Sequence, residues 1–215
     1  MKDQPLLRRI FVPAIAMSLS AGFVGFMLSP SGQAAPKRIS HEITDAKGDF
    51  LPSFTVAPHN PDLDVLGATV QLRGDRLVFS ATLAGRVGQT AGALYVWGLD
   101  RGKGTERFLK GNPAIGAGVF FDSVLIIRPN GTGVFNDLLN NTSTTIDSSR
   151  IKIEGRQLSA DLPLALFPST GRTPSKYTWN FWPRVGLGQN NQVSDFAPDA
   201  VNAPIEQVAK TEQQQ

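Results

Sequence analysis

Acidic side chains gather in three short loops of the sequence. They are Asp45-Ala-Lys-Gly-Asp49, Asp62-Leu-Asp64 and Ser194-Asp195-Phe-Ala-Pro-Asp199. Ca²⁺ takes roughly six to eight oxygen ligands from carboxylates, carbonyls and waters, and turns leave such oxygens free. Gly48 allows the first loop to curl, and an extended segment would place Asp62 and Asp64 on one side.

These loops predict a structural calcium site if the first and last strands of the fold are neighbours. The predicted ligands are Asp45, Asp49, Asp62, Asp64, Asp195 and Asp199. Their spacing does not fit an EF-hand loop. The alternative is that each aspartate only caps its own turn, as Asx residues do.

Aromatic side chains offer a second kind of chemistry. Trp97 lies on a predicted strand over Ala93 to Leu99, and Trp182 ends another over Tyr177 to Trp182, beside a proline and an amide-rich loop. Exposed rings stack on sugar rings, and nearby polar groups fix the ligand. We expect Trp182 to be exposed; the alternative is that the indoles fill the core. The predicted ligand-binding residues are Trp182, Arg184, Asn190, Asn191 and Trp97.

Motifs of catalysis are missing from the sequence. The chain has no cysteine, and its two histidines, His41 and His59, lie in no protease or nucleophile motif. The segment Gly98 to Thr105 has three residues between its first two glycines where a phosphate loop needs four, so we expect an ordinary glycine-rich loop. We expect no enzyme; a glycan hydrolase with two facing carboxylates is the least favoured alternative.

The first residues carry the pattern of an export signal. Lys2, Arg8 and Arg9 precede an uncharged, mostly apolar run from Ile10 to Leu28, and small residues end at Ala34. This order is typical of a cleaved signal peptide. We therefore predict a signal helix and an exported protein, either periplasmic or extracellular.

Cleavage changes the expected partners. The run of nineteen residues is nearly long enough to span a bilayer, so an uncleaved anchor is the alternative, but after cleavage no stable membrane insertion is expected. Because the first 35 residues hold three basic and one acidic residue, the 21 basic and 18 acidic residues of the whole chain become 18 and 17. A nearly neutral chain without basic clusters predicts no nucleic-acid partner.

The remaining sequence alternates with the period of a β-strand. A hairpin is predicted with its turn at Gly74-Asp75, and a second with its turn at Gly155-Arg156. Two segments, Ala93 to Leu99 and Val119 to Ile127, are apolar on both faces, which favours strands covered on each side. The pattern predicts an all-β fold, a single antiparallel β-sandwich of jelly-roll type.

The expected boundaries follow from composition. We expect a signal peptide over 1–34, a leader over 35–40, the β-sandwich over 41–199 and a polar, disordered and flexible C-terminal tail over 200–215. The tail has too few apolar residues to dock firmly.

Several of these segments together resemble a known superfamily. Asp45-Ala-Lys-Gly-Asp49-Phe50, Asp62-Leu-Asp64, the hairpin Gly74 to Leu83 and Leu94-Tyr-Val-Trp97 resemble the start of the β-sandwiches that include family 9 carbohydrate-binding modules and DOMON domains. The resemblance implies a sandwich that binds a saccharide or haem, in some members with structural Ca²⁺. DOMON domains typically ligate haem through Met and His. All three methionines, Met1, Met17 and Met27, lie in the predicted signal peptide, so no haem is expected.

A longer pattern joins both ends of the domain. Gly48 to Pro52 with Trp182 to Asp199 resembles a group of exported bacterial proteins that brings no known activity. The sequence thus predicts an exported, non-catalytic module that binds a saccharide or cell-envelope polymer and holds structural calcium. A structural or adhesive envelope protein is the alternative, and it would bury all three tryptophans.

Overall fold

The computed structural model describes residues 42–208. The predicted signal peptide, the leader, His41 and residues 209–215 lie outside the described residues. Within residues 42–208 no helix is long and apolar enough to cross a bilayer.

The strands are β1 (Ile43–Thr44), β2 (Val65–Arg73), β3 (Arg76–Leu83), β4 (Ala93–Asp100), β5 (Ser123–Ile127), β6 (Gly133–Asp137), β7 (Thr142–Ile146), β8 (Ile151–Glu154), β9 (Gln157–Pro163), β10 (Thr178–Val185), β11 (Ala203–Pro204) and β12 (Glu206–Gln207). The short 3₁₀ helices are η1 (Pro61–Leu63), η2 (Arg107–Lys110), η3 (Ser148–Arg150), η4 (Leu164–Leu166), η5 (Pro174–Lys176) and η6 (Asn190–Gln192).

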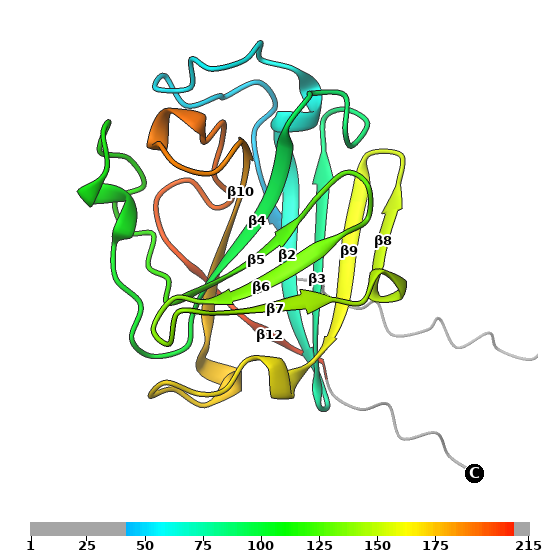
Figure 1. Ribbon diagram of the computed structural model, residues 1–215, viewed down its shortest axis with the longest axis vertical. Coiled ribbons are helices and arrows are strands. Elements are labelled where there is room, and N and C mark those ends of the chain that lie inside the picture. The colour runs from blue at the N-terminus through cyan, green and yellow to red at the C-terminus, as the bar shows by residue number, and fades with distance from the viewer. Residues whose placement is uncertain (1–41, 209–215) are drawn as a thin grey trace, which may run out of the picture. The chain divides into compact units, whose positions relative to one another are not determined.

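The strands form two packed sheets, which confirms the predicted antiparallel β-sandwich (Figure 1). The first sheet has the order β1-β2-β3-β9-β8, and β12 pairs with β2. The second has the order β11-β10-β4-β5-β6-β7. All pairs are antiparallel except β12 with β2.

Both predicted hairpins are present with the expected turns. β2 and β3 pair up to Arg73 opposite Arg76, and β8 and β9 pair up to Glu154 opposite Gln157. Each two-residue turn begins with a glycine at a φ of 61°, Gly74 or Gly155. A side chain is strained at such a φ, so glycine at these positions sets the register of the strands that follow.

Two hydrophobic cores explain why the central strands are apolar on both faces. The larger core lies between the sheets and contains the inner-face residues, among them Phe79, Trp97, Leu125 and Trp179. A second core lies on the outer side of the second sheet, where segments 106–121 and 186–200 cover it. Its buried residues are Leu94, Val96, Phe108, Val119, Phe121, Val124, Ile126, Trp182, Val193 and Phe196. β4 and β5 are therefore buried along their whole length.

The ordered sandwich extends beyond Asp199, so the expected flexible tail over 200–215 is wrong for its first residues. β11 pairs with β10, β12 pairs with β2, and Ala203 and Ile205 are buried. β1 and β12 cover different stretches of the same edge of β2, at Gly67–Ala68 and at Gln71–Leu72. The unpaired backbone N–H and C=O groups of that edge bind this segment, whose few apolar residues would not be enough to hold it in place.

Candidate metal centre

The first two acidic loops are brought together by the pairing of β1 with β2. The Asp45 N–H donates to the Leu66 carbonyl at 3.1 Å, so the loop over residues 45–49 runs beside the start of β2. The Gly48 N–H lies 3.1 and 3.0 Å from the two carboxylate oxygens of Asp64 and donates to them. The glycine and its positive φ of 86° allow the loop to close over that carboxylate.

The third loop arrives from the other end of the chain. After β10 the chain turns back, and Phe181 and Ala197 exchange two backbone hydrogen bonds of 3.0 and 2.8 Å. The Val65 N–H then donates to the Asp195 carboxylate at 2.8 Å. Segments some 130 positions apart in sequence thus meet where β2 begins.

Four of the six predicted metal ligands converge at this point. They are Asp45, Asp49, Asp195 and Asp199, which we call the acidic cluster. One oxygen from each lies within 4.8 Å of the corresponding oxygen of every other. Two ligands on opposite sides of a Ca²⁺ ion are about 5 Å apart, so one ion can contact all four.

The other two predicted ligands differ from each other. Asp64 borders the acidic cluster and is bound by Gly48. Asp62 lies outside it: its carboxylate accepts hydrogen bonds from the Thr90 N–H (2.8 Å) and hydroxyl (2.7 Å), close to Tyr95. The expectation of one extended segment is wrong, because η1 occupies 61–63 and directs the two aspartates apart.

Burial and like charge act together on these carboxylates. Asp195 is 1% exposed, and burial, followed by the charges of Asp45 and Asp49, raises its pKa to about 8. Burial, with the charges of Asp199 and Asp49, raises the pKa of Asp45 to about 7. The pKa values of Asp64 and Asp199 are also raised, first by burial and then by neighbouring Asp49.

No basic side chain balances the acidic cluster. Among residues 42–208, none of its members forms an ion pair with lysine, arginine or histidine. The Oδ2 atom of Asp45 is buried and accepts no hydrogen bond. Such a set of oxygens needs protons or a cation, and carboxylates with turn carbonyls and water are the ligands of Ca²⁺, Mg²⁺ and Mn²⁺.

The structure does not support the predicted aromatic platform. Trp182 is 2% exposed, with its ring edge-on to Phe108 at 5.0 Å between centroids, so the prediction of an exposed ring is wrong. Trp97 is fully buried between the sheets, 4.4 Å from Phe181. The loops of the second core cover the side of β10 that carries Trp182. The local sequence alone was compatible with either an exposed or a buried ring there.

The polar residues expected beside Trp182 tie loops together. Arg184 donates to the carbonyls of Gly186 (2.6 Å) and Gln189 (3.1 Å), and burial lowers its pKa. Asn190 is also buried. Its amide donates to the Phe108 and Pro113 carbonyls at 2.6 and 2.7 Å.

Asn191 has a weaker link of the same kind. Its amide lies 3.5 Å from the Thr55 hydroxyl. The predicted set of Trp182, Arg184, Asn190, Asn191 and Trp97 therefore forms no common surface for a ligand.

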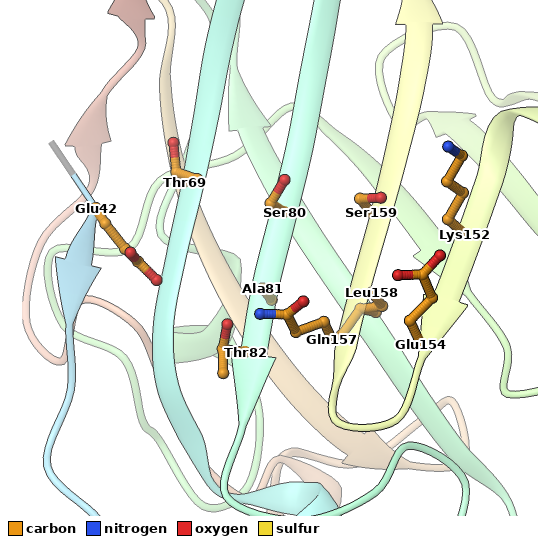
Figure 2. Close-up of a pocket in the computed structure, with 10 residues that line it drawn as sticks. All are labelled: Glu42, Thr69, Ser80, Ala81, Thr82, Lys152, Glu154, Gln157, Leu158 and Ser159. Atoms are coloured by element: carbon orange, nitrogen blue, oxygen red, sulfur yellow. The ribbon is translucent and has the colours of Figure 1, made fainter. Parts of the chain in front are cut away.

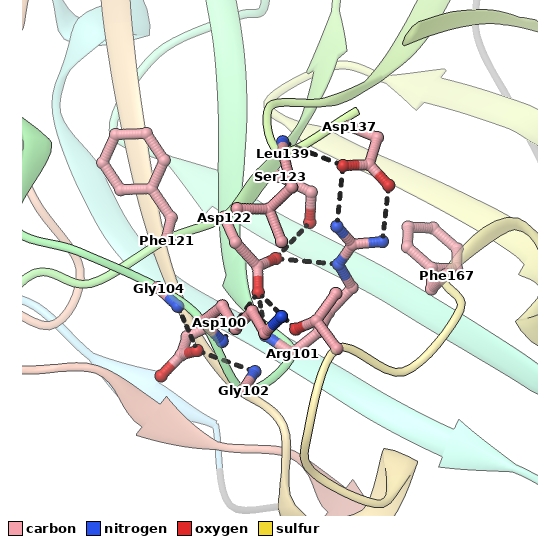
Figure 3. A network of polar contacts seen from close by, with 12 residues as sticks. Asp100, Arg101, Gly102, Gly104, Phe121, Asp122, Ser123, Asp137, Leu139 and Phe167 are labelled. Atoms are coloured by element: carbon pink, nitrogen blue, oxygen red, sulfur yellow. Dashed lines mark hydrogen bonds and ion pairs between the residues drawn. The ribbon is translucent and has the colours of Figure 1, made fainter. Parts of the chain in front are cut away.

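A second carboxylate cluster was not predicted from the sequence. The fully buried Arg101 lies between Asp122 and Asp137, a set that we call the arginine network (Figure 3). Its Nε donates to Asp122 at 2.7 Å, and Nη1 donates to Asp137 at 3.2 Å. Nη2 lies 3.1 Å from Asp137 in an ion-pair contact that is not a well-aligned hydrogen bond. The loop that carries Arg101 is the glycine-rich loop expected after a strand.

A groove on the outer face of the first sheet was likewise not predicted from the sequence (Figure 2). The signal was present as the polar half of the alternation in β3 and β9. The lining residues are Glu42, Thr69, Ser80, Ala81, Thr82, Lys152, Glu154, Gln157, Leu158 and Ser159, around a volume of about 290 Å³.

Comparison of the chain with models of known protein families gives no match, and comparison with curated proteins gives none either.

Proposed function

We propose that this chain is an exported, non-catalytic binding module whose β-sandwich is closed by one structural Ca²⁺ ion. The observation that carries the proposal is the acidic cluster: four carboxylates, each with one oxygen within 4.8 Å of the others, and no ion pair with a basic side chain of residues 42–208. Asp49 and Asp199 are exposed, whereas Asp45 is half-buried and Asp195 is buried. Unpaired charge on Asp45 and Asp195 is costly, and a divalent cation would remove that cost by ligating the oxygens directly.

The position of the cluster supports a structural role for the ion. Asp45 and Asp49 come from the loop after β1, whereas Asp195 and Asp199 follow β10. An ion bound to all four would join the two ends of the domain. Sites of extracellular modules bind Ca²⁺ with dissociation constants of about 10⁻⁴ to 10⁻³ M, which suits the export proposed from the first 34 residues.

The compactness of the cluster argues against a glycan hydrolase. A pair of catalytic carboxyl groups is separated by about 5 to 5.5 Å in retaining enzymes and about 6.5 to 9.5 Å in inverting ones, to leave room for sugar and water. In the acidic cluster four carboxylates each place one oxygen within 4.8 Å of the others, a convergence that suits one ion and that a mechanism with two carboxylates does not need. A bound cation would keep Asp45 and Asp195 ionised although burial raises their pKa values.

A structural or adhesive envelope protein is the second candidate. The burial of Trp97, Trp179 and Trp182 favours it, because this class needs no aromatic platform. The two candidates share the calcium site and differ in whether a small polar ligand binds.

Thermal unfolding of residues 35–215 in EDTA and then in excess Ca²⁺ tests the proposal. An ion at a hundred times its dissociation constant adds about 2.7 kcal/mol to the free energy of unfolding, which raises Tm by roughly 5 to 10 °C. Asp49→Asn should abolish the shift. Asp75→Asn, in the exposed turn of the β2–β3 hairpin, should leave it unchanged. An equal Tm with and without Ca²⁺ would rule out the structural ion.

A further inference from the structure

The outer face of the first sheet carries an ordered array of polar side chains. One row crosses four strands through Thr69, Ser80, Ser159 and Lys152, which are directly paired neighbours. Strands lie about 4.8 Å apart, so the row is roughly 14 Å long.

A second row runs parallel to the first. It passes from Gly67 through Thr82 and Gln157 to Glu154. A side chain at Gly67 would meet the Glu42 carboxylate, with 2.7 Å from its Cβ to Oε1. Glu42 therefore extends over the place where the row lacks a side chain.

The two rows form a groove with a charged group at each end. Figure 2 shows Glu42 at one end and Lys152 with Glu154 at the other. The hydroxyls of the rows and the Gln157 amide lie between them.

The polar groups of this groove have no partner in the part of the chain that the structure describes. Among residues 42–208, none of these side chains forms a hydrogen bond, and the Thr69 hydroxyl oxygen is buried without a partner. The buried amide of Asn190, by contrast, donates to two backbone carbonyls. An array of unpartnered hydroxyl, amide and carboxylate groups in a concave surface is ready to exchange its hydrogen bonds with water for those of a ligand.

The chemistry of the lining selects the kind of ligand. Hydroxyls and an amide both donate and accept, which matches a ligand that also does both. Two carboxylates against one ammonium disfavour phosphate and nucleic acid. The lining has no aromatic ring, and its apolar members, Ala81 and Leu158, turn their side chains into the core.

We propose that the groove binds a short neutral oligosaccharide that lies across β2, β3, β9 and β8. This inference rests on the proposed function as a binding module and names its ligand and its surface. Without stacking rings the affinity is modest, with an expected Kd of about 0.1 to 1 mM.

Calorimetric titration of the purified protein in excess Ca²⁺ tests the assignment, with cellohexaose, chitohexaose and maltohexaose as probes. At least one probe should bind, and Thr82→Val, which keeps the shape but removes the hydroxyl, should weaken that binding roughly tenfold. The matched control is Thr144→Val, an exposed strand position on β7 of the other sheet. It should bind like the unchanged protein, and both variants should unfold at the unchanged Tm.

Two results would overturn the inference. If no probe binds up to about 10 mM, the groove is not an oligosaccharide site. If a probe binds equally to the Thr82→Val and Ser159→Ala variants, the module has its site elsewhere. Neither result affects the calcium-dependent Tm, so failure of the groove is distinguishable from failure of the calcium site.

Discussion

The molecule contains two carboxylate clusters that differ in where their positive charge comes from. In the arginine network the chain supplies it: Arg101 contacts Asp122 and Asp137, and all three are buried. In the acidic cluster no basic side chain among residues 42–208 pairs with the aspartates. The exposure differs as well, because Asp195 alone of the acidic cluster is buried, Asp45 is half-buried, and Asp49 and Asp199 are exposed.

The pKa values record this difference. Burial alone would raise the pKa of Asp137, but hydrogen bonds from Asn140 and the charge of Arg101 lower it. In the acidic cluster burial and like charge both act upward, to about 7 for Asp45 and about 8 for Asp195. Asp137 thus shifts in the opposite direction to Asp45 and Asp195, because it receives hydrogen bonds from Asn140 and faces Arg101 instead of other carboxylates.

The largest expected effect comes from removing the internal counter-charge. Arg101→Met leaves two buried carboxylates unpaired and should lower the free energy of unfolding by about 3 to 5 kcal/mol, measured by urea titration. Arg76→Met is the matched control, because Arg76 pairs with Asp161 on the surface. It should cost at most about 1 kcal/mol. An equal loss of unfolding free energy in the two variants would show that the buried carboxylates do not depend on Arg101 for their stability.

The pH dependence of stability should separate the two clusters. In EDTA the folded protein retains protons on Asp45 and Asp195 that the unfolded chain loses near pH 4, so the free energy of unfolding falls as pH rises from about 4 to 8. We expect a fall of roughly 1 to 3 kcal/mol after screening. Asp137, with its lowered pKa, adds stability above about pH 4 that is lost in acid.

Excess Ca²⁺ provides the control for this profile. Cation binding keeps the acidic cluster ionised, so the fall toward pH 8 should vanish while the loss in acid persists. Urea midpoints measured across this range with EDTA and with Ca²⁺ give both curves. A fall toward pH 8 that Ca²⁺ leaves unchanged would show that other groups cause it.

The smallest effect is a stabilisation by neutralising one carboxylate. In EDTA near pH 8, Asp45→Asn removes a repelled charge and keeps an oxygen for the Ala46 N–H, so the free energy of unfolding should rise by about 1 kcal/mol. In Ca²⁺ the same variant should be less stable than the unchanged protein, because a ligand is lost. Asp75→Asn should change neither value, and scanning calorimetry measures all of them.

Local patterns in the sequence predicted the fold well. The alternation in β3 and the glycines of both turns determine hairpins from neighbouring residues alone, and both hairpins are found. The edge pairing of β12 with β2 was not predicted. It depends on backbone groups left free by a strand 135 positions earlier, and no side-chain pattern encodes that.

The candidate site was predicted only in part, because some of its contacts depend on residues far apart in the sequence. Aspartates in loops beside the first and last strands do gather, because strand pairing brings those loops together. Asp62 was misassigned because a proline at 61 starts a 3₁₀ turn in a segment that resembles a strand. Trp182 was misassigned because burial on its side of β10 depends on Phe108 and other residues about 70 positions away.

The edge of β2 has a consequence for the order in which the chain folds. Two segments pair with this edge, Ile43–Thr44 and Glu206–Gln207. β2, which lies near the start of the described chain, is thus paired in part with residues near its end. Contacts between such distant segments form slowly, and an open strand edge invites pairing with other chains until they do. Until Glu206–Gln207 pair with β2, the edge of β2 at Gln71–Leu72 stays open to pairing with other chains.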